Sequence, residues 1–231
     1  MNLPHAKYRI LTGNYGSGKT ELAIALARYF RRETGKRTAL VDLDIVNPYF
    51  RSAEQKALLE AEGIEVFMPS FAMSTVDIPA LPAEILSVFT QDFAHVMIDL
   101  GGDDTGATAL GRYYPYLQAR RDQIQTLYVV NVLRPLSGTA QDIASLFALI
   151  ESRARIRPDF LVNNANLQEQ TAVQDLIEAQ ATLAEASALL QVPIGMVTGD
   201  ARLYPSLPPS MQALFFPFAP LMKPEWLQEQ A

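Results

Sequence analysis

The chain has 231 residues, of which 49% are hydrophobic, and this length and composition are typical of a globular domain rather than a disordered or fibrous chain. Its formal net charge of −6 and its sequence pI near 5.0 argue against general nucleic-acid binding. The absence of cysteine excludes disulfides, thiolate metal sites, iron–sulfur clusters and a cysteine nucleophile.

Short apolar segments alternate with longer segments of helical periodicity along the chain. Strands are predicted at 8–12, 38–42, 64–67, 95–100, 126–132, 160–163 and 194–198. Helices are predicted at 18–32, 52–62, 79–90, 138–153 and 171–190. Apolar strands separated by helices indicate a parallel sheet covered on both faces, and right-handed crossovers make it a doubly wound α/β domain. No linker divides residues 1–231, so one domain is expected, with ligands at the carboxyl ends of its strands.

The segment after the first predicted strand fits the phosphate-binding pattern G-x-x-x-x-G-K-[ST] in full. It consists of Gly13, Asn14, Tyr15, Gly16, Ser17, Gly18, Lys19 and Thr20, and Glu21 follows it. Its glycines let successive backbone N–H groups point at phosphate oxygens, and the next helix presents its positive end. Lys19 can reach the β- and γ-phosphates, and the Thr20 hydroxyl can ligate Mg²⁺. We therefore predict that these residues, Glu21 included, form a nucleotide site.

Two carboxylates end the second predicted strand, in the segment VDLDIVNPYFRS. Alternation along a strand places Asp42 and Asp44 on the same side, near the phosphate and metal positions if this strand lies close to the first. Asp44 can orient or deprotonate the attacking water, and Asp42 can hold a metal-bound water. The alternative is that both carboxylates cap the turn at Asn47 and Pro48.

A third signal is the segment HVMIDLGGDDTG, in which four apolar or weakly polar residues lead into Asp99. A buried strand that ends in an aspartate is the arrangement in which the carboxylate binds Mg²⁺. Gly102 follows three residues later, and its N–H can approach a γ-phosphate. The alternative is an ordinary glycine turn, with Asp104 capping the next helix.

Together these three segments resemble the P-loop ATPases of the MinD, ParA and nitrogenase iron protein class. The resemblance spans most of the chain and implies a mainly parallel sheet of seven or eight strands, Mg–ATP binding and two nucleotide-driven switch regions, at 42–47 and 99–104. Lys19 and Thr20 match the phosphate-loop pair of this class. Asp44 matches its hydrolytic aspartate, and Asp99 matches its metal-side aspartate.

Two later segments resemble the parts of this class that surround the base. The segment FLVNNAN ends in asparagines and implies that Asn163 reads the base, although a polar turn is the alternative. The segment PIGMVTGD resembles the strand and loop that close over the base, and it ends at Asp200. A guanine-reading N-K-x-D motif would place an aspartate where this chain has Asn166, and an amide is a poor match for the guanine edge. These residues favour ATP over GTP.

Asn14 stands where the MinD/ParA type carries a signature lysine that reaches across a dimer to the partner's phosphates. Asn14 is neutral and too short for that role. Either the protein works without such a lysine or another cation replaces it. Arg51 is the favoured replacement, Arg112 and Arg134 are further ones, and a solvated loop arginine is the alternative for each.

The favoured function is a slow ATP-hydrolysing switch that acts on an unidentified client protein and forms a nucleotide-dependent homodimer. The alternative is an ATP-dependent kinase or ligase resembling dethiobiotin or cobyrinate amide synthases, with an acceptor site at 113–121. The absence of cysteine and the missing guanine motif count against a metal-insertion GTPase. The intact residues Lys19, Thr20, Asp44 and Asp99 count against an inactive binding module.

The last part of the chain, 200–231, is rich in proline and aromatic residues and is predicted to pack on the body of the domain. Its prolines oppose the long amphipathic helix that a membrane anchor needs, and an exposed docking site is the alternative. No run of 18 apolar residues exists, so we expect no membrane span. The missing cysteines and the lack of an apolar leader fit a cytoplasmic protein.

Overall fold

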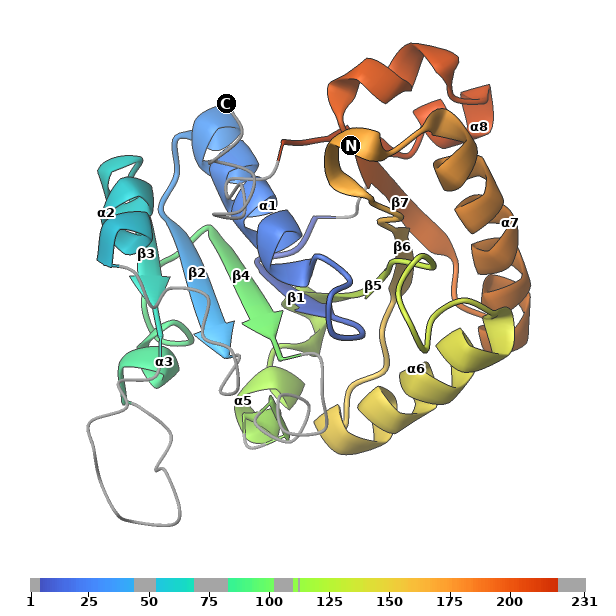
Figure 1. The fold of residues 1–231 in the computed structure, drawn as a ribbon. Helices are drawn as coiled ribbons and strands as arrows, with labels where there is room; N and C mark the ends of the chain where they lie inside the picture. Colours follow the sequence, from blue (N-terminus) through green and yellow to red (C-terminus); the bar gives the residue numbers. More distant parts are fainter. Residues whose placement is uncertain (1–4, 44–52, 69–82, 102–109, 112, 220–231) are drawn as a thin grey trace.

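The computed structural model describes residues 5–43, 53–68, 83–101, 110–111 and 113–219. Eight strands form one sheet in the order β3-β2-β4-β1-β5-β6-β7-β8, and every neighbouring pair is parallel (Figure 1). The expected doubly wound, parallel α/β fold is therefore confirmed, with eight strands. The strands are β1 (Tyr8–Thr12), β2 (Thr38–Leu43), β3 (Ile64–Phe67), β4 (His95–Leu100), β5 (Ile124–Val130), β6 (Phe160–Asn163), β7 (Ile194–Gly199) and β8 (Phe215–Pro217).

Helices and short 3₁₀ segments connect these strands. The helices are α1 (Lys19–Thr34), α2 (Ala53–Ala61), α3 (Ala83–Ser87), α5 (Tyr114–Gln118), α6 (Ala140–Ala154), α7 (Val173–Leu190) and α8 (Pro209–Gln212). The 3₁₀ segments are η2 (Arg121–Gln123), η3 (Gln168–Gln170) and η4 (Ala201–Ser206).

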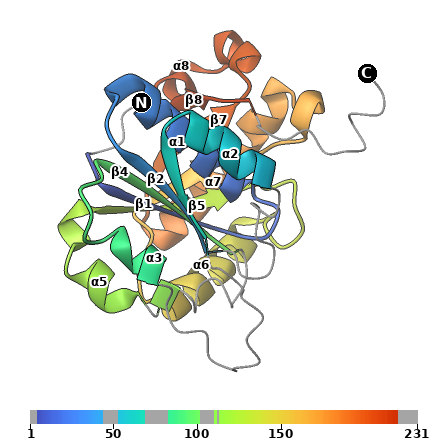
Figure 2. The ribbon, with the colours of Figure 1, turned by 90° about the vertical axis from the view of Figure 1, so that its left-hand side faces the viewer.

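The central strands are buried on both faces, which explains why their sequences are continuously apolar rather than alternating. Every residue of β1, β2, β4 and β5 is buried. Within β1, Tyr8 and Ile10 contribute to a core cluster with residues of α3 and α5, whereas Leu11 contributes to a cluster with α1. Figures 1 and 2 show α1 and α2 on one side of the sheet and α3, α5 and α6 on the other. The direction of winding reverses at β1, so the end of this strand is the expected ligand position.

Local sequence signals set the ends of the long helices. Gly18 precedes α1 with φ +85°, and Gly35 follows it in the left-handed region and donates its N–H to the Arg31 carbonyl at 2.9 Å. Helix α6 begins with a capping box, in which the Thr139 hydroxyl and the Asp142 carboxylate each satisfy the other residue's N–H. These residues fix where α1 begins and ends and where α6 begins.

Several predicted boundaries differ from the structure. Strand β5 begins at Ile124, two residues before the predicted start, because Ile124 and Gln125 already pair with Tyr8 and Arg9 of β1. Strand β8 was missed, since it has only three residues and ends in a proline, and its parallel pairing with β7 is a long-range property. Of the predicted helix 79–90, residues 79–82 lie outside the described part, and α3 ends at Ser87.

The imidazole of His95, at the start of β4, is buried near an aromatic ring and a cationic side chain. Its ring stacks on Phe30, with 4.5 Å between ring centroids, and the Arg9 guanidinium carbon lies 4.1 Å from the same Phe30 ring centroid. Neither ring nitrogen of His95 has a hydrogen-bond partner within the described ranges. Burial, followed by the positive charge of Arg9, lowers the pKa of His95 from 6.5 to about 4.

We expect His95 to make the fold sensitive to acid. Between pH 6.5 and about 4 the unfolded chain binds a proton that the folded chain excludes, so this contribution to stability is complete above pH 6.5 and is lost as the pH falls. His95→Phe removes the titrating group and should flatten the fall of the unfolding free energy in this range, measured by urea denaturation at several pH values. His5→Gln, at an exposed position, should keep most of the decrease in unfolding free energy with falling pH. An equal pH dependence of the unfolding free energy in His95→Phe and in the unmodified protein would contradict the assignment.

Candidate nucleotide-binding site

The loop between β1 and α1 is held tightly against its neighbours. Gly13 has φ +144°, and a Cβ atom there would lie 2.1 Å from the Val129 carbonyl oxygen of β5. Gly18 has φ +85°, and a Cβ atom there would lie 2.4 Å from the Asn164 side-chain nitrogen. Both positions therefore require glycine, and the loop has the compact shape that cradles phosphates in proteins with this sequence pattern.

Lys19 is the first residue of α1 and is only 6% exposed. Its ammonium group folds back over the loop, and Nζ donates a hydrogen bond to the Asn14 carbonyl oxygen at 3.0 Å. The same carbonyl accepts the Ser17 N–H at 3.2 Å. The structure therefore places a positive charge and the positive end of a 16-residue helix at the same loop, which favours an anion.

Thr20 and Asp99 meet beside this loop although they are far apart in the sequence. The Thr20 hydroxyl donates to the Asp99 carboxylate at 2.6 Å. Asp42 is the register partner of Asp99 across β2 and β4, and both aspartates are buried. The three predicted metal-side residues thus come together at the carboxyl ends of adjacent strands.

These oxygen donors fit Mg²⁺ rather than a metal that needs a full protein cage. Mg²⁺ is commonly held by one or two carboxylates, with phosphate oxygens and water supplying the other ligands. The described part of the chain contains no group of three or more His, Cys, Asp or Glu side chains arranged to hold a metal. The hydroxyl of Thr20 and the carboxylates of Asp42 and Asp99 form a small, hard donor set of the kind that Mg²⁺ shares with a bound nucleotide.

Asn14 joins the phosphate loop to the segment that follows β5. Its side-chain Nδ2 donates to the Pro135 carbonyl at 2.8 Å and to the Ser137 hydroxyl at 3.1 Å. Its Oδ1 accepts the Tyr15 N–H at 2.8 Å. The Tyr15 side chain is 68% exposed and does not fill the loop.

A cavity of about 360 Å³ opens beside the phosphate loop. Its size is within the range of small-ligand sites. Its walls are rich in amides, and they comprise Gly16, Ser17, Gly18, Glu21, Asn131, Arg134, Asn164, Asn166, Gln168 and Phe218. The cavity therefore joins a phosphate-binding loop to polar groups that can recognise a base.

The structure does not bring the two predicted base-end residues to this cavity. Asn163 is fully buried, and its amide nitrogen donates to the Leu176 carbonyl at 3.0 Å and to the Gln180 side chain at 2.9 Å. Asp200 caps η4 by accepting the Arg202 N–H at 2.8 Å. Neither residue lines the cavity, so their contacts here are those of structural residues.

Asn164, next to the predicted base-reading Asn163, lines the cavity beside the loop. Its Nδ2 donates to the Ser17 carbonyl at 2.6 Å, and its Oδ1 accepts the Thr198 hydroxyl. Asn131 was missed as a wall of the cavity. It directly follows the apolar run of β5, as Asp99 follows that of β4, and this shared position at a strand end is the signal that would have identified it.

Several predicted residues lie outside the described part of the chain. They are Asp44, Gly102, Arg51 and Arg112. The two predicted switch regions are described only at 42–43 and at 99–101. The roles assigned to these residues remain predictions.

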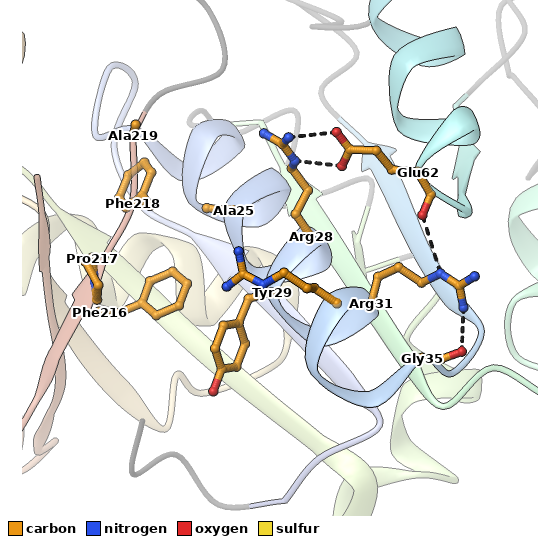
Figure 3. A pocket seen from close by; sticks show the side chains of 11 residues that line it. Ala25, Arg28, Tyr29, Arg31, Gly35, Glu62, Phe216, Pro217, Phe218 and Ala219 are labelled. Atoms are coloured by element: carbon orange, nitrogen blue, oxygen red, sulfur yellow. Dashed lines mark hydrogen bonds and ion pairs between the residues drawn. The ribbon is translucent and has the colours of Figure 1, made fainter. Parts of the chain in front are cut away.

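A larger cavity, of about 700 Å³, lies on the outer face of α1 beside β8 (Figure 3). Its cationic groups already have partners within the chain. Arg28 forms two hydrogen bonds of 2.7 Å with the Glu62 carboxylate, and Arg31 donates to the Gly35 carbonyl at 2.6 Å. Both arginines belong to the later turns of α1, whereas the phosphate loop precedes this helix. The phosphate loop is therefore the better candidate for the nucleotide site, although this second cavity has the larger volume.

Comparison with known proteins agrees with this geometry. A sequence model of the CobQ/CobB/MinD/ParA nucleotide binding domain matches residues 10–200, from within β1 to the end of β7. The comparison with curated proteins found no match. None of the helices in the described ranges is long and apolar enough to cross a membrane.

Several solved structures share the fold. FlhF in complex with GTP and Mg²⁺ is 17% identical, with a TM-score of 0.52, and the match covers 86% of this chain and 68% of FlhF. FtsY from Mycoplasma mycoides is 15% identical, with a TM-score of 0.51, and the match covers 84% of this chain and 61% of that one. FtsY from Thermotoga maritima is 21% identical, with a TM-score of 0.52, and the match covers 94% of this chain and 67% of that one. At these identities the likeness shows the fold alone.

Proposed function

Because this chain belongs to the CobQ/CobB/MinD/ParA nucleotide-binding domain family, we propose that it binds Mg–ATP, hydrolyses it slowly and acts as a nucleotide-dependent switch on a partner protein. The observation that carries the proposal is the 2.6 Å hydrogen bond between Thr20 and Asp99 beside the loop that bears Lys19. It joins the hydroxyl and the carboxylate that this class of site uses for Mg²⁺, at the point where the phosphates would lie.

Each residue of the site has a distinct role in this proposal. Lys19 and the N–H groups of the loop hold the β- and γ-phosphates, and Thr20 and Asp99, with Asp42 through water, hold Mg²⁺. The metal neutralises negative charge on the phosphates. Asp44 orients the attacking water, and Gly102 approaches the γ-phosphate. The last two roles rest on the sequence resemblance.

The amide-rich wall of the smaller cavity supports ATP as the nucleotide. Asn131, Asn166 and Gln168 line it, and Asn166 stands where a guanine-reading motif has an aspartate. A carboxylate accepts both N–H groups of the guanine edge, whereas an amide offers one donor and one acceptor, as the adenine edge requires. The Mg–GTP complex of FlhF belongs to a protein only 17% identical, so its nucleotide does not decide the base here.

A kinase or ligase would need a site for its second substrate, and residues 113–121 were expected to form it. The contacts of this segment favour the switch instead. Tyr113 and Leu117 are buried in the core cluster of β1 and β4. The Arg120 guanidinium donates to the Phe89 and Tyr116 carbonyls, both at 3.0 Å. These groups support the fold, which leaves this segment poorly suited to bind a second substrate.

The proposed function is tested first on the unmodified protein. Titration calorimetry with Mg–ATPγS, Mg–GTPγS and Mg–ADP should give binding in the micromolar range, tighter for the adenine triphosphate than for the guanine one. Light scattering should show a larger mass with Mg–ATPγS than with Mg–ADP. No binding at millimolar nucleotide would reject the nucleotide site, whereas binding with a constant mass would favour the kinase or ligase.

Asp44→Ala should separate binding from hydrolysis. We expect its ATP affinity to remain within about threefold of the unmodified protein, because the phosphates are held elsewhere. Phosphate release should fall by about 10²- to 10⁴-fold, the usual contribution of a positioned base. The measurement is single-turnover phosphate release, with Asp122→Ala, in η2, as a control for loss of a carboxylate. Undiminished turnover would remove Asp44 from the mechanism.

A further inference from the structure

Arg134 lies against the phosphate loop, although the loop that carries it begins at the end of β5. A Cβ atom built on Gly16 would be 3.6 Å from Arg134 Nε and 3.7 Å from its Cδ. Arg134 also lines the same cavity as Gly16, Ser17 and Gly18. Its side chain is exposed, and no described residue accepts a hydrogen bond or ion pair from its guanidinium. A positive group is thus directed along the rim of the loop and is available to a ligand there.

The turn that carries Arg134 is anchored at both ends. Arg134 donates its N–H to the Asn131 carbonyl at 3.1 Å, and its own carbonyl accepts the Ser137 N–H at 3.3 Å. The buried Asn131 side chain accepts the Leu133 N–H at 3.1 Å and donates to the Asn166 carbonyl at 3.1 Å. The turn therefore has a defined conformation before any ligand binds.

Asn14 provides the link between this turn and the phosphate loop. Its Nδ2 bonds to the Pro135 carbonyl and the Ser137 hydroxyl fix the turn directly above the loop. A lysine at position 14 has no acceptor oxygen and a longer, flexible stem, so it cannot reproduce the paired contacts through Nδ2 and Oδ1. Where the MinD/ParA class has a cationic lysine, Asn14 thus forms hydrogen bonds to the turn that carries the cationic Arg134.

We propose that Arg134 contacts the phosphates of the bound nucleotide in cis, and that Asn14 is a positioning residue that holds the Arg134 turn in place. This inference rests on the proposed nucleotide binding and names a further residue of that site. A guanidinium forms paired, charge-assisted hydrogen bonds to phosphate oxygens. Because Arg134 belongs to the same chain as the loop, the charge that the MinD/ParA class receives from a second subunit is supplied without a dimer.

The test compares Arg134→Ala with Arg32→Ala, which removes the same charge from an exposed site in the last turn of α1. Binding of Mg–ATPγS should weaken by about 10- to 100-fold in Arg134→Ala and remain unchanged in Arg32→Ala. Arg134→Lys should recover part of the loss. The dependence of binding on salt should become shallower in Arg134→Ala alone, a readout that a structural defect would not give. Equal affinities in Arg134→Ala and Arg32→Ala would overturn the assignment, whereas an unmodified protein that binds no nucleotide would reject the proposed function itself.

The role of Asn14 is tested by a double-mutant cycle. Asn14→Ala should weaken Mg–ATPγS binding in the unmodified background but have little further effect when Arg134 is already alanine. The ratio of the affinities of the unmodified protein and Arg134→Ala should be the same at several protein concentrations, since the cation acts within one chain. Additive losses would show that Asn14 acts independently of Arg134, and a loss that appears only at concentrations where the protein dimerises would show that Arg134 acts across a dimer.

Discussion

Replacing Lys19 with alanine is expected to reduce the affinity for Mg–ATPγS by at least about 100-fold, beyond the range that calorimetry detects for a micromolar ligand. The ammonium lies within the loop, 3.0 Å from the Asn14 carbonyl, and is only 6% exposed. A charge in so enclosed a position is screened much less by solvent than one on the surface. Its loss also leaves the phosphates facing fewer donors.

Lys36→Ala is the matched control, because it removes a lysine from an exposed site beyond the far end of α1. Thermal unfolding of both variants should show that the fold is intact. Mg–ATPγS should raise the unfolding temperature of Lys36→Ala and of the unmodified protein but not that of Lys19→Ala. If Lys19→Ala retained its affinity, the phosphate loop would not be the nucleotide site.

Phe147→Ala is expected to lower the free energy of unfolding by about 3–5 kcal/mol, the usual effect of removing a buried phenyl ring. Phe147 is fully buried in the core cluster that joins α6 and α7 to β5 and β6. Its ring contacts Tyr128 edge-on, with centroids 5.3 Å apart, and the Arg157 guanidinium carbon lies 5.4 Å from its centroid. The cavity left by the ring would be closed off by these elements and could not collapse easily.

Urea denaturation measures this effect, and Leu149→Ala provides the control on the same helix. Leu149 is 40% exposed, so its replacement should cost less than about 1 kcal/mol. The dependence of the unfolding free energy on urea should be similar for both variants, which would show that the folded state is preserved. A loss in Phe147→Ala no greater than in Leu149→Ala would mean that this part of the core repacks freely.

Features that depend on local pattern were predictable from the sequence. Seven of the strands were identified, four of them with the observed bounds, because buried parallel strands are continuous apolar runs. The approach of Thr20 to Asp99 was also predictable, since the carboxyl ends of parallel strands share one edge of the sheet. The combination of the loop pattern with two aspartate-ending strands was enough to indicate the family.

Features that depend on the direction of single side chains were not predictable. Asn163 and Asn164 are identical neighbours, and only the placement of β6 against α7 and the phosphate loop decides which one meets the loop. Among three arginines expected at one edge of the sheet, the favoured Arg51 lies outside the described residues, and the structure brings Arg134 against Gly16. Strand β8 could not be predicted either, because a segment of three residues is too short to show a periodic pattern.

The arrangement of β1 has a consequence for biosynthesis. Tyr8 at the start of β1 pairs with Val96 on one side and with Ile124 on the other, and Gly13 packs against Val129. During synthesis, β1 must therefore wait until β4 and then β5 have been made before it can pair on either side. Such late closure of distant pairs makes folding slow. The loop between β1 and α1, whose Gly13 packs against Val129, consequently reaches its final shape only after β5 is in place.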